Sequence, residues 1–355
     1  MFVPVFLNNH FMSKLFIGLF FVSLFPLMNM QAQTLFVDPV KGKDTGTGTE
    51  HDPLLSLGRA VTVANTFTGK NPIKIKLYPG LYMLTDQLEL KPPAGNGYAT
   101  DYTIEAVILP DDKGWMPSAM PVIQSISPNN KNWANFDHCT GLQVERNNTH
   151  FRGLKFVGNT NPAVVYYYAI ERHFPELKGM EISQCIFAGS RNTAPIQGAV
   201  FAQGNDIKVD HCIFYECKNA LLLFLSVNGF SLTNSIIYGS YEGAIWFGKY
   251  SDFDFRNNII ANNKAFWIGM KDYTPHYTFA NSLITDNEIF MGLNNNGSIE
   301  LDSRSKPGTK NVQRSGKVVL NVASSDTIPA NYLQPSAVSA GKNIPAGIFN
   351  TNKRD

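Results

Sequence analysis

The sequence has few cysteines and few charged residues for its length. Four of 355 residues are cysteine, and no two have the spacing of paired metal ligands, which excludes a disulfide scaffold and a zinc module. Charged residues make up 16%, with 30 basic against 28 acidic side chains and no long basic run. This balance lacks the electrostatic footprint of a nucleic-acid-binding protein, so we expect no nucleic acid as partner.

The first feature of the sequence is a predicted targeting segment at residues 1–33. Lys14 precedes the apolar residues 15–27, and a small, polar run around Gln31 and Ala32 follows. That order is typical of a secretory signal peptide, and the apolar stretch is short for a membrane span. A membrane anchor is the alternative, disfavoured by Pro26 within the run. We expect a secreted or periplasmic protein after signal-peptide removal, without a membrane span in the mature chain, and translation from Met12 is an alternative start.

A repeat organises the middle of the chain. Each copy has two apolar positions separated by one residue, then a polar pair, then two apolar residues. The copies start 23 to 31 residues apart, a period that predicts a solenoid of stacked coils. The alternation indicates two short strands joined by a tight turn. The six copies start at Thr149, Met180, Ile207, Phe230, Phe253 and Tyr277.

A third apolar stretch follows each repeat, such as GAIWFG from Gly243. It is short, bounded by Gly or Asn, and rich in aromatic and branched residues, so we expect a third strand. Three strands per coil predict an all-β fold, a right-handed parallel β-helix. A leucine-rich repeat is the competing solenoid. Cys185 and Cys212 fall at equivalent inward turn positions, where we expect stacked thiols, with a disulfide between them as the alternative.

The opening of the mature chain resembles a known family. Residues 36–61 carry Gly42, Asp44, Gly48, Pro53 and Ser56 in the order seen at the start of secreted bacterial right-handed parallel β-helix proteins of the pectate-lyase-like superfamily. The sequence FRGLKF, residues 151–156, is similar to an inner coil of the β-helix repeat family. Residues 331–341 resemble its closing segment, although a serine follows the proline where the family has glycine.

The resemblance implies a domain organisation and a broad function. We expect an N-terminal helical cap with the first coils over residues 34–120, β-helix repeats over 121–300 and a C-terminal closing segment over 301–355. The family includes polysaccharide lyases, glycoside hydrolases and members without known catalysis. The resemblance therefore implies a fold more strongly than an activity.

A strip of aromatic residues is the first candidate site. With Ile245 and Phe247 pointing inward, alternation places Trp246 outward. Sugar rings stack on such faces without needing charge. The alternatives are reversed parity or a loop that covers the strip. By alignment of the third strands, and with a nearby tyrosine, the predicted substrate-binding residues are Phe201, Trp246, Trp267, Phe290 and Tyr168.

Charged residues in the loops beside the third strands are the second candidate site. An acid could hold calcium or donate a proton while Lys or Arg acts as base, which is what a polysaccharide lyase needs. Paired carboxylates would instead serve glycoside hydrolysis. The alternative is the solvated rim of a solenoid. The predicted catalytic residues are Glu171, Arg172, Lys249, Lys271 and Asp272.

These observations predict a secreted β-helix protein that binds an extracellular polysaccharide and has the residue types for lyase- or glycosidase-like cleavage. The only cofactor we consider is calcium, in the case of a lyase. The alternative is a non-catalytic β-helix solenoid that binds carbohydrate or another surface. The scarcity of outward charge on the third strands counts against a strongly charged lyase cleft.

Overall fold

We analysed a computed structural model of the chain. It describes Met1 and residues 33–92, 100–133, 136–223, 225–248, 253–270, 278–323 and 328–350. Residues 2–32 of the predicted signal peptide lie outside the described residues. No helix in the described part of the chain is long and apolar enough to cross a lipid bilayer.

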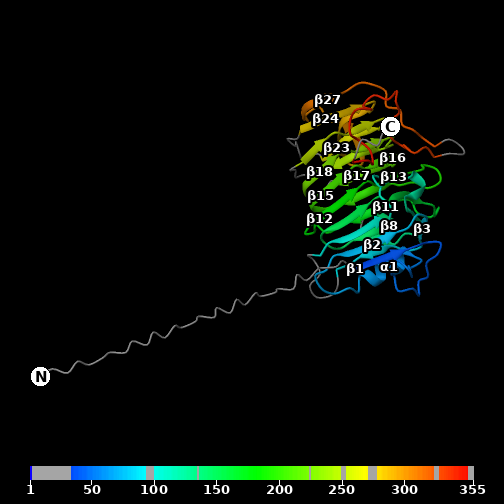
Figure 1. Cartoon of the computed structure of the whole chain (residues 1–355). Coiled ribbons are helices and arrows are strands. Elements are labelled where there is room, and N and C mark those ends of the chain that lie inside the picture. The colour runs from blue at the N-terminus through cyan, green and yellow to red at the C-terminus, as the bar shows by residue number, and fades with distance from the viewer. Residues whose placement is uncertain are drawn as a thin grey trace. The chain divides into compact units, whose positions relative to one another are not determined.

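Parallel strands stacked in sequence order form the body of the structure (Figure 1). They belong to a 17-stranded and a 10-stranded sheet, and each coil contributes three strands, as the repeat predicted. The 17-stranded sheet contains two rows of strands, which a tight turn joins in most coils. The first row comprises β1 (Gln33–Val37), β2 (Ile73–Leu77), β5 (Tyr102–Ala106), β9 (Thr149–Arg152), β12 (Lys178–Ser183), β15 (Gly204–Asp210), β18 (Val227–Thr233), β21 (Phe253–Arg256), β24 (Thr278–Thr285) and β27 (Gly308–Gln313). The second row comprises β3 (Leu81–Leu84), β6 (Val122–Ser125), β10 (Lys155–Asn159), β13 (Ile186–Ala188), β16 (Ile213–Tyr215), β19 (Ile236–Tyr238) and β22 (Ile259–Ala261), and it ends on the second half of β24.

The 10-stranded sheet, called the third-row sheet below, contains the third strand of each coil. Its parallel members are β4 (Leu88–Leu90), β8 (Phe136–Val144), β11 (Tyr167–Arg172), β14 (Gly198–Ala202), β17 (Asn219–Leu223), β20 (Gly243–Phe247), β23 (Ala265–Met270) and β25 (Ile289–Asn295). Two strands pair antiparallel at its margins, β7 (Lys131–Trp133) with β8 and β26 (Ser298–Leu301) with β25.

A short helix, α1 (Leu57–Ala64), follows β1 and packs against β1 to β4. Ser56 caps its first turn, because the hydroxyl accepts a hydrogen bond from the Arg59 N–H at 3.1 Å. The Asp44 carboxylate in turn accepts hydrogen bonds from the Ser56 N–H and hydroxyl, both at 2.8 Å. These contacts give two residues of the opening motif a structural role at the start of the helix. A 3₁₀ turn, η2, spans Pro117–Ala119.

Side chains at equivalent positions stack along the coils inside the main core. The rings of Phe156, Phe187 and Phe214 lie nearly parallel, with centroids 4.7 and 4.8 Å apart. Those separations match the spacing between neighbouring strands, so one residue per coil continues the column. Stacking of each coil on the next therefore buries the apolar face that a single coil would expose.

The turn between the first and second rows explains the polar pair of the repeat. The first residue of the pair adopts a left-handed conformation in successive coils, for example at Asn234 and Asn257, where φ is 50° and 58°. Asparagine tolerates that conformation better than most residues. The second residue points inward and bonds the next coil. The Ser235 N–H donates to Asn258 Oδ1 at 2.9 Å, and the Asn258 N–H donates to Ser282 Oγ at 2.9 Å.

Cys185 and Cys212 occupy the same inward turn position, as predicted. They are buried free thiols, and each lies 3.3 Å from the carbonyl oxygen two residues earlier. Burial raises the pKa of the Cys212 thiol well above its ordinary value and that of Cys217 to about 12. These groups therefore stay protonated and act as small core residues.

The chain after β27 folds back over the outer side of the second row. One of the two apolar residues that end each repeat faces the main core, as Phe187 does, and the other faces this C-terminal segment, as Ile186 does. Phe349 packs edge-on against Trp115, with ring centroids 5.3 Å apart. The residues buried under the C-terminal segment include Ile186, Ile213, Ile236, Ile259 and Leu283, and the segment contributes Val318, Leu320, Leu333, Ile348 and Phe349.

Candidate functional site

The third-row strands depart from simple alternation in a way that shapes their outer face. In β14, Ala199 and Val200 both face the main core, while Gly198 and Phe201 lie on the other side. The neighbouring coils repeat this pattern, so outward positions are three residues apart instead of two. Two outward columns result. The first contains Thr140, Tyr168, Gly198, Asn219 and Gly243, and the second contains Gln143, Glu171, Phe201, Leu222, Trp246, Ile268 and Gly292.

A buried carboxylate stands in the second column. Glu171 on β11 is 1% exposed, and its Oε2 accepts a hydrogen bond from the Thr140 hydroxyl on β8. His138 Nε2 lies 3.5 Å from Oε2, and His173 Nδ1 lies 3.8 Å from Oε1. Gln143 is adjacent to Glu171 in the strand pairing, and its buried side-chain oxygen has no hydrogen-bond partner among the described residues. One acid is thus flanked by two imidazoles and a hydroxyl.

The two imidazoles differ in their access to solvent. The His138 side chain is 2% exposed, whereas that of His173 is 32% exposed. Burial is the main cause that lowers the pKa of His173, the Glu171 carboxylate opposes that shift, and His138 and Lys131 add to it. His173 is therefore neutral near pH 7, with one ring nitrogen facing the carboxylate. A neutral imidazole held in this way can accept a proton from a group outside the protein.

An aromatic cluster continues from this acid along the same face. Tyr168, Phe201 and Leu222 form its buried part, and Tyr166 and Trp246 are its half-buried members. The His173 ring stacks on Phe201 with centroids 5.9 Å apart and planes 22° apart. The acid and the aromatic cluster therefore meet at one place. Three strand steps of about 4.8 Å put the backbone of Trp246 about 14 Å from that of Glu171.

Two glycines let the aromatic rings lie against the sheet. A Cβ at Gly198 would come 2.6 Å from the Tyr168 ring, and a Cβ at Gly243 would come 2.7 Å from Trp246 Nε1. Neither side chain could keep its position if these glycines carried a methyl group. Trp246 is also fixed by a hydrogen bond from Nε1 to Asn219 Oδ1 at 2.6 Å. The indole is therefore held in place before any ligand arrives.

A polar network holds Asn219 in turn. Its side-chain N–H donates to Glu242 Oε2 at 2.6 Å, and Glu242 forms an ion pair with Lys218 at 3.4 Å. Lys218 Nζ lies 5.3 Å from the centre of the Tyr166 ring, and the Asn219 amide lies 3.3 Å from the Tyr166 hydroxyl. The network links both half-buried rings of the cluster, so their positions depend on each other.

The structure places three of the five predicted substrate-binding residues on the outer face of the third-row sheet and directs the other two toward the main core. Tyr168, Phe201 and Trp246 lie on the outer face. Trp267 does not, because the strand pairing aligns it with the inward Ile245, and it is 1% exposed in the main core. Phe290 also packs against the main core and stacks on Phe266. The strand pairing aligns Trp246 with Ile268 and Gly292, so the predicted alignment is off by one residue at Trp267 and by two at Phe290.

Arg172 does not join Glu171, contrary to the predicted pairing. The two are adjacent on β11 and point to opposite faces. Arg172 is fully buried, and its guanidinium donates to the backbone oxygens of Gln203 at 2.7 Å and Asn205 at 3.2 Å. Burial lowers its pKa to about 10, so it remains a cation at neutral pH. Its position indicates that it holds the turn after β14.

The other three predicted catalytic residues, Lys249, Lys271 and Asp272, lie outside the described residues. Within the described ranges no group of three or more His, Cys, Asp or Glu is placed to hold a metal ion. The sequence prediction missed the roles of His138 and Thr140 beside Glu171. The pairing of β8 with β11 brings them together, and only a register for these two strands would have revealed it.

A match to one protein family agrees with this fold. Residues 140–313 match the family described as right handed beta helix region. No curated protein matches the chain. A solved rhamnogalacturonan lyase is 11% identical, with a TM-score of 0.44 over 79% of this chain and 87% of the other. Pectate lyase Pel9A is 14% identical, with a TM-score of 0.43 over 87% and 90%. Pectin methylesterase PemA from Erwinia chrysanthemi is 9% identical, with a TM-score of 0.40 over 81% and 91%.

These likenesses to solved structures are too distant to indicate an activity or a substrate. The fold does not depend on them, because the strand pairing, the turn ladder and the family match agree with one another. This chain therefore folds as a right-handed parallel β-helix, and its residues 140–313 belong to the right handed beta helix region family.

Proposed function

We propose that the protein binds a polysaccharide along the outer face of the third-row sheet and cleaves it by acid–base chemistry at Glu171 and His173. The observation that carries this proposal is the junction between a buried carboxylate–imidazole pair and an aromatic cluster on one face. Consistent with the predicted signal peptide, we place the substrate outside the cytoplasm.

The binding part of the proposal rests on the half-buried rings. Trp246 and Tyr166 lie against the sheet, and their positions are fixed by Asn219 and Gly243. Pyranose rings present C–H groups that pack on an aromatic face and hydroxyls that hydrogen-bond to nearby amides and carboxylates. A distance of about 14 Å between Trp246 and Glu171 requires a ligand of several sugar units. A polymer, rather than a single sugar, fits that separation.

The catalytic part of the proposal assigns a separate task to each group. His173 is neutral and partly exposed, so it acts as the general base toward water or a sugar carbon. Glu171 orients the ring through Nδ1 and stabilises the imidazolium after proton transfer, and the imidazolium then gives its proton to the leaving glycosidic oxygen. The 3.8 Å separation is longer than a hydrogen bond, and such contacts often shorten when substrate binds. Calcium enters this proposal only if the reaction is elimination from a uronate polymer.

The decisive experiment combines product and binding assays on the mature protein. Neutral and uronate polysaccharides are incubated with it, and both reducing ends and ultraviolet absorbance are measured. New reducing ends without absorbance indicate hydrolysis, whereas both signals indicate elimination. In a Ser-His-Asp triad the carboxylate that orients the imidazole is worth about 10⁴-fold, so Glu171→Gln should lower the rate at least 100-fold. The matched control is Glu181→Gln, because Glu181 also lies near an imidazole, His150 at 3.7 Å, but on the first row.

Three results would count against parts of the proposal. Retention of a polysaccharide without product would overturn catalysis and establish a non-catalytic binding module. Equal rates for the two glutamate variants would remove the role of Glu171. Absence of both retention and product across the panel would overturn binding at this face.

A further inference from the structure

A separate hollow lies where the second-row strands lead into the third-row strands. It measures about 390 Å³, and its walls come from successive coils. Its charged and aromatic lining does not include the acid–base pair or the aromatic cluster described above. That lining consists of Arg191, Glu216, Tyr241, Lys264, Asp286 and Glu288.

The hollow exists because one position in a column of turn residues has no side chain. Glu216, Gly239, Asn262 and Asp286 occupy the same turn in four successive coils, each with a left-handed backbone, φ between 51° and 75°. The N–H of each of the first three bonds to the coil that follows it, with N···O distances of 2.9 to 3.4 Å. Gly239 therefore leaves a gap between the side chains of Glu216 and Asn262.

The walls of the hollow offer many hydrogen-bonding groups and little apolar surface. The Arg191 guanidinium lies over the Tyr241 ring, 4.2 Å from its centre, and carries five N–H donors. Ser240 also lines the hollow. It is 1% exposed, and its hydroxyl has no hydrogen-bond partner among the described residues. Buried hydroxyls without a partner are rare, so this one indicates that a ligand or a water molecule binds in the hollow.

The charged side chains that line the hollow indicate which class of ligand it binds. Three carboxylates face two cations, and no ion pair joins any of these five side chains in the described structure. Glu216 and Asp286 are three coils apart, about 14 Å along the stack, so they do not converge on one point. That spacing is wrong for a single metal ion, and the excess of carboxylates repels an anion. A long, uncharged ligand with many hydroxyls matches both the acceptors and the donors.

We propose that this hollow is a second carbohydrate site, which binds a short run of neutral sugar units across the coils at Gly239. The carboxylates of Glu216, Asp286 and Glu288 accept hydrogen bonds from sugar hydroxyls, and Arg191 and Lys264 donate to sugar oxygens. The site is independent of the acid–base pair, so it would let the protein hold a second chain or branch without cleaving it.

The test fills the hollow with a side chain that the fold already accepts. Asn262 occupies the equivalent turn position one coil later with φ 58°, and a Cβ at Gly239 would meet the flexible Glu216 side chain at 3.3 Å. The Glu216 backbone N and Cα would lie at 3.8 and 3.9 Å, which are ordinary contacts, so Gly239→Asn should fold normally, as judged by circular dichroism and thermal melting. Binding of cellotriose, xylotriose, mannotriose and trigalacturonate is measured by calorimetry. We expect one or more of the neutral trisaccharides to bind, and Gly239→Asn to weaken that binding at least tenfold.

Two further variants make the result unambiguous. Arg191→Ala, at an exposed position, should weaken binding several-fold and checks the site if Gly239→Asn fails to fold. Trp246→Ala should leave binding at the hollow unchanged, because that ring belongs to the third-row face. No binding of any neutral trisaccharide, preference for trigalacturonate, or unchanged affinity in both Gly239→Asn and Arg191→Ala would overturn the proposal. Loss of polysaccharide retention in Trp246→Ala alone bears only on the proposed function.

Discussion

Replacing Asn258 by alanine should test whether the inward turn ladder holds the coils together. Asn258 is fully buried, and its side chain makes two hydrogen bonds to the preceding coil. Its Oδ1 accepts from the Ser235 N–H at 2.9 Å, and its Nδ2 donates to the Leu232 carbonyl at 2.8 Å. Alanine would leave the Ser235 N–H buried without a partner and would remove the second bond to the Leu232 carbonyl, which also lies in the strand ladder. At about 1–3 kcal/mol for the unsatisfied N–H and about 0.5–1.5 kcal/mol for the other bond, the free energy of unfolding should fall by about 1.5–4.5 kcal/mol.

The adjacent asparagine supplies a matched control. Asn257 is half-buried, and its side chain donates one hydrogen bond to Asn234 Oδ1 at 3.0 Å. Its φ of 58° is one that glycine adopts freely, so Asn257→Gly should lower the free energy of unfolding by less than about 1 kcal/mol. Urea unfolding gives the global comparison, and hydrogen exchange at the Ser235 amide reports the local effect. Equal losses in the two variants, or unchanged exchange at Ser235, would refute the proposed role of the ladder.

Two further predictions concern the third-row face. Gly243→Ala places a methyl group 2.7 Å from Trp246 Nε1 and should reduce polysaccharide retention in affinity electrophoresis, whereas Gly269→Ala, where the nearest atom lies 3.8 Å away, should not. Equal retention would show that the indole does not contact the ligand. Burial lowers the pKa of His173 below its ordinary 6.5, so the stability that the neutral ring contributes is fully present above pH 6.5 and is lost as pH falls toward the folded value. His173→Phe should flatten the dependence of the melting temperature on pH over that range, and an unchanged slope would contradict the shift.

The fold could be predicted because the residue type at each position of the repeat reflects the environment of that position. A left-handed turn favours asparagine, and an inward position between coils favours a small polar side chain such as Ser235. The two apolar residues that close each repeat looked equivalent in the sequence. In the structure Phe187 enters the main core while Ile186 lies under the C-terminal segment. Local chemistry therefore fixed the strands and turns, but the second layer depends on a segment far along the chain.

The candidate site was harder to predict because it depends on register. In β23, Phe266 and Trp267 are consecutive aromatic residues, and both point inward. Either could be aligned with Trp246, so a shift of one residue placed the wrong ring outside. Register also decides which residues surround Glu171. His138 and Thr140 precede it by about thirty residues, and only the pairing of β8 with β11 brings them to the carboxylate.

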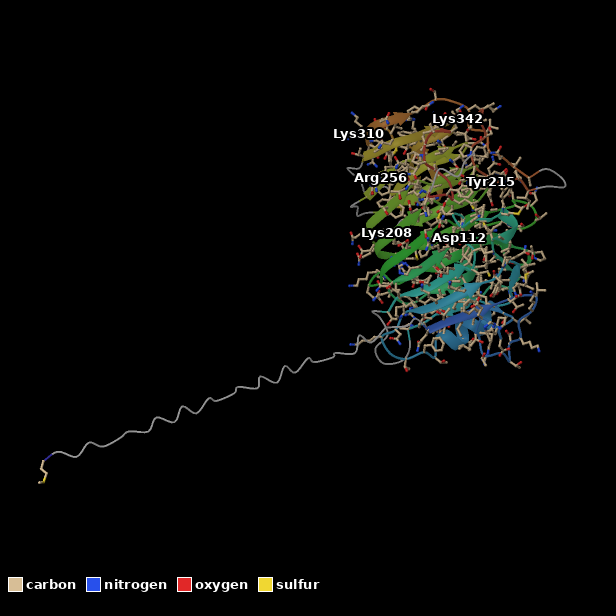
Figure 2. All side chains as sticks on the ribbon, in the orientation of Figure 1. Asp112, Lys208, Tyr215, Arg256, Lys310 and Lys342 are labelled. Carbon is tan, nitrogen blue, oxygen red and sulfur yellow. The ribbon has the colours of Figure 1, made fainter. Side chains whose placement is uncertain are left out.

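The distribution of side chains over the three rows explains why the ligand is assigned to the third-row sheet. The outer side of the first row carries acids, such as Glu181 and Asp254, as well as basic residues. The basic residues Lys208, Arg256 and Lys310 lie along one side in Figure 2. These charges hydrate that side. The C-terminal segment covers the apolar outer side of the second row. In the described structure, the third-row sheet combines half-buried rings with a buried acid, and a polymer that uses both must cross several coils. Cleavage should therefore require a longer substrate than the hollow at Gly239 requires for binding.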